Sequence, residues 1–195
     1  MTEKEKCDLG LMYNPLEFIG DMFAARDKCT EYGNIPFSEF ERRVEFIKNL
    51  FGKTGEKVFV ENGFKCNLGY NIEVGENFYC NFNCTIYDAG KVKIGDNVMF
   101  GPCVTLCTAT HPTKASERLN EAGEELSFPI TIGDNVWIGG GVTIIGGVTI
   151  GKDSVIGAGS VVIRDIPEGV LAAGNPCRVI RKLTPEDRNK YVHAE

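Results

Sequence analysis

A six-residue repeat of aliphatic side chains runs through the second half of the sequence and restricts the possible folds more than any other feature. The repeated positions are Ile132, Ile138, Ile144, Ile150, Ile156 and Val162. Glycine mostly follows each of them, and the residue four places on is mostly small or β-branched. This period predicts a hexapeptide β-helix, in which short strands wind into triangular coils and the aliphatic residues point inward. Glycine, Asp and Asn suit the corners, where the backbone often needs positive φ.

The same period continues upstream with two interruptions. Its inward positions there are Leu68, Val74, Cys80, Ile86, Ile94, Phe100 and Leu106. Two residues are inserted around 89–93, and a polar stretch at about 108–128 breaks the rhythm. We therefore expect a mainly β protein, a single-stranded parallel β-helix over residues 58–183 with an excursion loop at about 108–128. The stacked triangular coils form a prism whose interior is filled with side chains. A functional site is therefore expected on the outside of this prism, in loops or between neighbouring prisms.

Helical patterns stand at the N-terminus, where they can cover the open end of a prism. An N-terminal helical segment is predicted over residues 1–57. Its first helix starts at Pro15 and ends near Gly33, with Leu16, Ile19 and Phe23 as an apolar face. The second has capping-box spacing, and its apolar stripe is Phe40, Val44, Ile47, Leu50 and Phe51. The capping box would pair Ser38 with Glu41.

The C-terminal segment has a different pattern from the repeats. Residues 172–181 predict a turn followed by a strand. Thr184 and Pro185, with acidic residues after them, are typical of a helix start. We therefore expect a short C-terminal tail helix over residues 184–195.

Composition excludes several classes of partner. The formal net charge is −6 and the sequence pI is near 5.1, which disfavours nucleic acid or an anionic membrane surface as the main partner. Charged and polar residues interrupt every apolar run, so no spanning helix is predicted. With no leader pattern at the N-terminus, a cytoplasmic protein is expected.

The eight cysteines are scattered and contain no Cys-x-x-Cys pair. Zinc sites usually combine closely spaced Cys and His residues, so no metal site is expected. Reduced thiols that pack as small apolar side chains are the better interpretation.

His111 is the candidate catalytic residue. The chain has only two histidines, and the other, His193, lies in the tail. His111 stands at the root of the predicted excursion loop, in the stretch Thr110-His111-Pro112. A neutral imidazole accepts protons near pH 7, so His111 suits the role of general base toward an acceptor hydroxyl. A histidine that only caps a turn is the structural alternative.

The repeats, the N-terminal helices and the stretches TATHP, ITIGDNVWIGG and AAGNPCRVIRKL together resemble the maltose and galactoside O-acetyltransferases. The similarity runs to about Leu183. It implies a left-handed β-helix, a homotrimer with intersubunit active sites, and acetyl-CoA as the acetyl donor in a groove between subunits. It also implies direct attack of a sugar hydroxyl on the thioester, with His111 as general base and no acyl-enzyme.

The resemblance assigns further site residues on both sides of the reaction. On the acceptor side it implies Asn81, Asp88, Asn67 and Glu125. In the cofactor groove it implies Gly140, Ala158, Ile163, Arg164, Arg178, Arg181 and Trp137. The amide of Gly140 is the implied donor to the developing oxyanion, and the arginines match or neighbour basic positions that bind the phosphates of coenzyme A.

Departures from the family pattern concern mainly the acceptor. Ala89 replaces a second aspartate, no acid is present at Asn14-Pro15, and Asn67 stands where some relatives have serine. A later Asn-Pro-Gly is replaced by residues 145–147, Ile-Gly-Gly. A xenobiotic alcohol or an amine therefore stays open as the acceptor, and so does a non-catalytic trimeric scaffold. A carbonic anhydrase on the same prism needs three histidines and is excluded.

Overall fold

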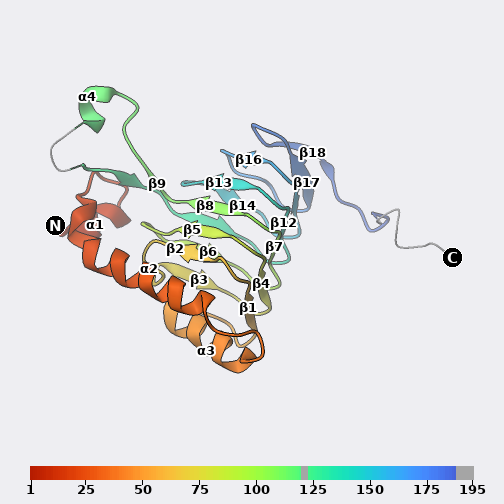
Figure 1. The fold of residues 1–195 in the computed structure, drawn as a ribbon. Helices are drawn as coiled ribbons and strands as arrows, with labels where there is room; N and C mark the ends of the chain where they lie inside the picture. Colours follow the sequence, from red (N-terminus) through yellow and green to blue (C-terminus); the bar gives the residue numbers. More distant parts are fainter. Residues whose placement is uncertain (120–122, 188–195) are drawn as a thin grey trace.

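The fold is a parallel β-helix with three faces, capped at its first coils by helices. The computed structural model describes residues 1–119 and 123–187. Figure 1 shows the coils stacked from β1, beside α2 and α3, to β17 and β18 at the opposite end.

Each face is a sheet built from one strand of every coil. The first face comprises β1 (Val58–Val60), β4 (Phe78–Cys80), β7 (Met99–Phe100), β12 (Trp137–Ile138), β15 (Val155–Ile156), β17 (Val170–Ala173) and the antiparallel β18 (Arg178–Lys182). The second comprises β2 (Lys65–Cys66), β5 (Thr85–Tyr87), β8 (Thr105–Cys107), β13 (Thr143–Ile145) and β16 (Val161–Val162). The third comprises β3 (Ile72–Val74), β6 (Val92–Ile94), β11 (Ile130–Ile132) and β14 (Thr149–Ile150).

The predicted six-residue register is confirmed. Ile138 pairs with Phe100 below it and with Ile156 above it, and Ile144 pairs likewise with Leu106 and Val162. All the predicted inward residues are buried. The prism interior is therefore the continuous apolar core of the molecule.

One corner of the prism carries a ladder of asparagine side chains. Asn77, Asn97, Asn135 and Asp153 have φ between 56° and 58°. Their side chains form a chain of hydrogen bonds of 2.8–3.0 Å, in which each amide donates to the next coil. Because Asn and Asp tolerate the left-handed backbone region, they replace glycine at these turns.

The N-terminal segment contains one helix more than predicted. Helix α1 (Glu3–Asp8) begins at Thr2, whose side chain accepts from the Glu5 amide, while the Glu5 carboxylate accepts from the Thr2 amide. This is a capping box, and its spacing is visible in the sequence.

The two longer helices match their predicted ranges, but the predicted apolar face of the first and the predicted capping box of the second are wrong. A 3₁₀ turn, η1 (Pro15–Phe18), precedes α2 (Ile19–Gly33), and α2 buries Ala25 and Tyr32. The predicted apolar face is 42–56% exposed, both at Leu16 in η1 and at Ile19 and Phe23 in α2, so it is not the face that α2 buries.

The predicted capping box before α3 (Phe40–Leu50) does not form. Glu39 takes the N-cap position, and no side chain caps the helix. Ser38 instead lies in a turn that the Glu39 amide closes on the Pro36 carbonyl at 3.0 Å. The helix therefore begins without a side-chain cap, and its buried residues attach it to the first coil.

The excursion loop leaves the prism after β8 and returns before β11. It contains a hairpin of β9 (Ala109–Thr110) with β10 (Leu126–Ser127), and the short helix α4 (Ala115–Arg118), which projects away from the coils in Figure 1. At the other end, the predicted strand is confirmed as β18. Residues 184–187 form a turn, and residues 188–195 of the predicted tail helix lie outside the described residues. None of the described helices is long and apolar enough to cross a membrane.

Candidate active site

His111 lies next to a buried carboxylate at the root of the excursion loop. It directly follows β9, and its imidazole is about half exposed. The Nε2 atom lies 3.9 Å from the Oε2 atom of Glu125, which stands just before β10 and is 7% exposed. Pairing of β9 with β10 therefore brings together two residues that are separated in the sequence.

Tyr13 fixes the carboxylate from the other side. Its hydroxyl donates to the Oε1 atom of Glu125, and the backbones of the two residues exchange N–H···O bonds of 3.1 Å. Burial and the hydrogen bond to Glu125 raise the pKa of Tyr13, so this hydroxyl stays protonated. Tyr13 carries no signal in the sequence that points to this role, because only the fold brings it to Glu125, 112 residues away.

Asp88 is enclosed rather than surface-exposed. Its side chain is fully buried, and its carboxylate accepts from the amides of Asn67, Leu68 and Gly69 at 2.7–2.9 Å. Desolvation raises the pKa of Asp88 to about 6, although the backbone hydrogen bonds oppose this shift. The direct sugar contact predicted for Asp88 is therefore not available in this arrangement, since both oxygens are turned toward the backbone at 67–69.

Asn67 carries an unsatisfied polar atom. Its side chain is 5% exposed, and its Oδ1 atom is buried without a hydrogen-bond partner among the described residues. A buried oxygen of this kind is costly unless a partner satisfies it. Asn67 lines two cavities, one shared with Tyr13 and Glu125 and another beside α2. Asn67 therefore lies near the excursion loop, because it shares a cavity with Glu125, the partner of His111.

Gly140 and Ala158 occupy equivalent positions at the corner between the first and second faces. The strand register places both above Pro102 in one column. The flanking amides of Gly139 and Gly141 bond to neighbouring coils at 2.8 Å, whereas the Gly140 and Ala158 amides donate to no residue that the structure describes. In the coil below, proline has no amide to donate. The column therefore presents two free N–H groups beside small side chains.

Asn81 and Trp137 lie on the same side of the prism as this column. Asn81 follows β4 at the same corner, and its Oδ1 atom accepts from the Phe82 amide at 2.8 Å. Trp137 projects outward from β12 and is 52% exposed. Both side chains can meet a ligand that approaches this corner.

The basic residues cluster around the last coils, where they are exposed. Ile163 follows β16, with Arg164 next to it. Arg178 begins β18 and donates to the Cys177 carbonyl at 2.8 Å. Arg181 pairs with Asp187 at 2.7 Å, so one of its nitrogens is already engaged. Within residues 1–119 and 123–187, no group of three or more His, Cys, Asp or Glu side chains is placed to hold a metal ion.

The predicted site residues form two separate groups in one chain. The strands of the second face run from the corner at Gly140 to the corner at Asp88 and Thr108. His111, Glu125 and Asn67 lie at the second corner, whereas Gly140, Ala158 and Asn81 lie at the first. The width of a sheet face therefore separates the candidate base from the candidate cofactor column.

Comparisons with known proteins agree with this architecture. Residues 129–164 match the family described as bacterial transferase hexapeptide (six repeats), and residues 6–55 match the maltose acetyltransferase hexapeptide capping motif. Galactoside O-acetyltransferase of Escherichia coli is 52% identical over 161 residues, which cover 83% of this chain and 78% of that protein.

Two solved structures are similar over nearly the whole chain. A galactoside acetyltransferase in complex with coenzyme A has a TM-score of 0.93 and 43% identity, covering 100% of this chain and 97% of that one. A maltose O-acetyltransferase from Clostridium difficile has a TM-score of 0.91 and 46% identity, covering 94% and 98%. The chain therefore belongs to the hexapeptide-repeat acetyltransferases, in the group that contains the galactoside and maltose O-acetyltransferases.

Proposed function

We propose that this protein transfers the acetyl group of acetyl-CoA to a hydroxyl of a sugar, with His111 as general base. The observation that carries the proposal is the position of His111, half exposed beside the buried Glu125 carboxylate. In this role His111 takes the proton of the acceptor hydroxyl while that oxygen attacks the thioester carbonyl carbon. The carbon–sulfur bond then breaks, and the imidazolium returns the proton to the departing coenzyme A thiolate. The nearby carboxylate stabilises the imidazolium that forms, and Tyr13 holds the carboxylate in place.

The column of Gly140 and Ala158 fits acetyl-CoA. Its free N–H groups and small side chains suit an extended chain of amides lying against the coils. Acetyl-CoA supplies the acetyl group as an activated thioester. The Gly140 amide donates to the carbonyl oxygen as negative charge develops there, an interaction worth about 2.7–4 kcal/mol in other enzymes. Arg164 and Arg178, which are exposed near the last coils, offer positive charge to the phosphates.

On the acceptor side, Asn67 and Asn81 supply neutral hydrogen-bonding groups. The unsatisfied Oδ1 atom of Asn67 suits a sugar hydroxyl as donor. Asp88 acts indirectly, because its carboxylate holds the backbone at 67–69 and thereby positions Asn67. Glu125 borders the same cavity as Asn67.

We propose a homotrimer as the working form, since one chain holds the two groups of residues at opposite ends of a face. A neighbouring copy that brings its Gly140 corner to the His111 corner completes the site. Cyclic symmetry then builds three equivalent sites from one kind of contact. We place the reaction in the cytoplasm, since all eight cysteines are unpaired in the structure and proteins with free thiols are typical of a reducing compartment.

The direct test is a transfer assay with acetyl-CoA and a panel of sugars, alcohols and amines. Free coenzyme A is best followed by chromatography, because the protein's own cysteines react with thiol reagents. We expect turnover with sugars. Turnover only with amines or non-sugar alcohols would move the acceptor to that class, and binding of coenzyme A without any turnover would refute the transfer.

His111→Ala tests the role of the base. Loss of the proton acceptor is expected to lower kcat by a factor of about 10²–10⁴, with coenzyme A binding retained. His193→Ala is the matched control, because His193 is the only other histidine in the chain, and its kcat should equal that of the unsubstituted protein. An unchanged rate for His111→Ala would remove it from the role.

Glu125→Gln keeps the size of the side chain and removes its charge. Because the carboxylate lies 3.9 Å from Nε2 of His111, its loss withdraws stabilisation from the imidazolium. We expect kcat to fall by about 10-fold or more, equivalent to at least about 1.4 kcal/mol, while the KM for acetyl-CoA stays constant. A change confined to KM would assign Glu125 to substrate binding alone.

A further inference from the structure

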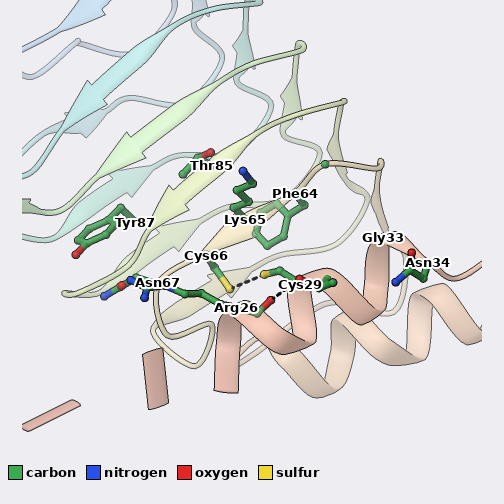
Figure 2. A pocket seen from close by; sticks show the side chains of 12 residues that line it. Arg26, Cys29, Gly33, Asn34, Phe64, Lys65, Cys66, Asn67, Thr85 and Tyr87 are labelled. Carbon is green, nitrogen blue, oxygen red and sulfur yellow. Dashed lines mark hydrogen bonds between the residues drawn. The ribbon is translucent and has the colours of Figure 1, made fainter. Parts of the chain in front are cut away.

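Two cysteines that have no role in the proposed acetyl transfer meet at the wall of a large cavity. The cavity has a volume of about 610 Å³ and lies between α2 and the lower strands of the second face. Cys29 comes from α2 and Cys66 from β2, and their Sγ atoms are 3.6 Å apart. In Figure 2 the two sulfur atoms point toward each other across the gap between helix and strand.

The two thiols differ in access. Both thiols line the cavity, but Cys29 is only half-buried, whereas Cys66 is buried and 7% exposed. A small reagent entering the cavity therefore meets the Cys29 sulfur first. Cys66 is placed to react only with what has already bound to Cys29.

The surroundings favour a thiolate at Cys29. The hydrogen bond with Cys66 lowers the pKa of Cys29 to about 7, and Lys65 contributes in the same direction against the opposing effects of burial and Asp88. The same contact and burial raise the pKa of Cys66. Arg26 and Lys65, which line the cavity, add positive charge that attracts anionic reagents. A thiolate is the reactive form of cysteine.

We propose that Cys29 and Cys66 form a redox-active pair, a modification site where a low-molecular-weight disulfide such as oxidised glutathione converts the two thiols into a disulfide between α2 and β2. Cys29 is the attacking thiol and Cys66 the resolving thiol. The product ties α2 to the first coil at the residue directly before Asn67.

The reaction balances as two successive exchanges. The Cys29 thiolate attacks one sulfur of the small disulfide, forms a mixed disulfide and releases one small thiolate. The Cys66 sulfur then attacks the Cys29 sulfur, its proton passes to the departing thiolate, and the protein disulfide forms. In total, two protein thiols are oxidised and one small disulfide is reduced to two thiols.

The other cysteines lack this arrangement. Cys80 and Cys84 also interact, but both are completely buried in the prism core. Cys103 is exposed, and no thiol of the described chain lies within hydrogen-bond distance of it. Selective loss of the Cys29 and Cys66 thiols therefore distinguishes the proposed pair from general oxidation.

The first test maps the product on the full, unsubstituted protein. After treatment with oxidised glutathione, remaining thiols are alkylated and the protein is digested without reductant for mass spectrometry. We expect two of the eight free thiols to be lost together and the Cys29 and Cys66 peptides to be joined. Failure of this link to form, or a dominant link between other cysteines, would overturn the proposal.

Single substitutions test the order of attack. In Cys66→Ser, Cys29 should stop at the mixed disulfide and carry one glutathione. In Cys29→Ser, Cys66 should remain a free thiol. Cys103→Ser is the control, in which the Cys29–Cys66 link should form as in the unsubstituted protein. Modification of Cys66 in the absence of Cys29 would contradict the assigned roles, and this readout does not depend on transferase activity.

Discussion

At the scale of single residues, Asp88 illustrates how a buried charge can organise a site without touching a ligand. The carboxylate of Asp88 accepts hydrogen bonds from the three successive amides at 67–69. The Asn71 side chain donates to the backbone carbonyl oxygen of Asp88 at 2.9 Å. The two-residue insertion in the repeat falls next to it, at a corner where Asp88, Ala89 and Gly90 are all buried. The insertion therefore gives the chain room to turn this carboxylate inward and place Asn67.

The raised pKa of Asp88 predicts that the stability of the fold depends on pH. Its pKa of about 6 in the folded protein lies above the value of about 3.9 in an unfolded chain. The folded state therefore holds this proton more tightly, so its stabilising contribution is complete below about pH 4 and is lost as the pH rises to about 6. The shift of about two units corresponds to about 3 kcal/mol.

Asp88→Asn tests this dependence, because asparagine does not titrate. Denaturation of both proteins at several pH values should show the stability of the unsubstituted protein, relative to Asp88→Asn, falling by about 2 kcal/mol between pH 4 and pH 7. If the difference instead grew with pH, the folded pKa would have to lie below the unfolded one.

The residue-scale site could be predicted only in part. His111 stood out because histidine is rare in the chain and because of its place at the break in the repeat. The burial of Asp88 and the Tyr13–Glu125 contact could not be predicted. Each depends on how distant segments stack, 112 residues apart in the case of Tyr13 and Glu125.

At the scale of elements, a buried arginine attaches α3 to the first coil. Arg43 is 1% exposed, and its guanidinium donates to the Ile35 carbonyl at 2.7 Å and to the Asn62 Oδ1 atom at 2.9 Å. It also lies 4.3 Å from the centre of the Tyr32 ring and 4.4 Å from that of Phe37. The planar group joins both helices and the prism in a way that lysine cannot reproduce.

Arg43→Lys is therefore expected to destabilise the protein by at least about 2 kcal/mol, since hydrogen bonds of charged groups contribute about 1.5–3 kcal/mol each. The unfolding temperature should fall by about 4–8 °C. Arg42→Lys is the matched control, because Arg42 is exposed and pairs with Glu39 at the surface. Its effect should stay within about 0.5 kcal/mol. Equal stability of the two variants would contradict the assigned role of Arg43.

The elements themselves were largely predictable, and their details less so. The ranges of α2 and α3 followed from apolar spacing and from glycine near their ends. The orientation of α2 did not, because its exposed apolar residues outnumber the buried Ala25 and Tyr32 that contact the prism. The capping box predicted from Ser38 also failed to form, because the chain makes a turn between Pro36 and Glu39 and the helix begins after Glu39.

At the scale of the whole molecule, the prism was the most predictable feature. A constant step of six predicts one set of inward-pointing residues along the coils, and all of these residues are buried. The sequence alone does not show that the two groups of site residues lie at opposite ends of one face, since that depends on where each corner falls. This separation leads to the central claim, that His111 of one copy acts on acetyl-CoA held by another.

Complementation between two inactive variants tests that claim most directly. His111→Ala removes the base, and Ala158→Trp blocks the cofactor column with a bulky side chain at an exposed corner. The two variants are co-expressed with different affinity tags, and trimers that carry both tags are isolated and assayed. In a closed ring of three that carries both variants, one of the three sites is intact, so kcat per protomer should recover to about a third of the original value. If mixed trimers form and remain as inactive as their parents, the site lies within one chain, which would contradict the proposed intersubunit site.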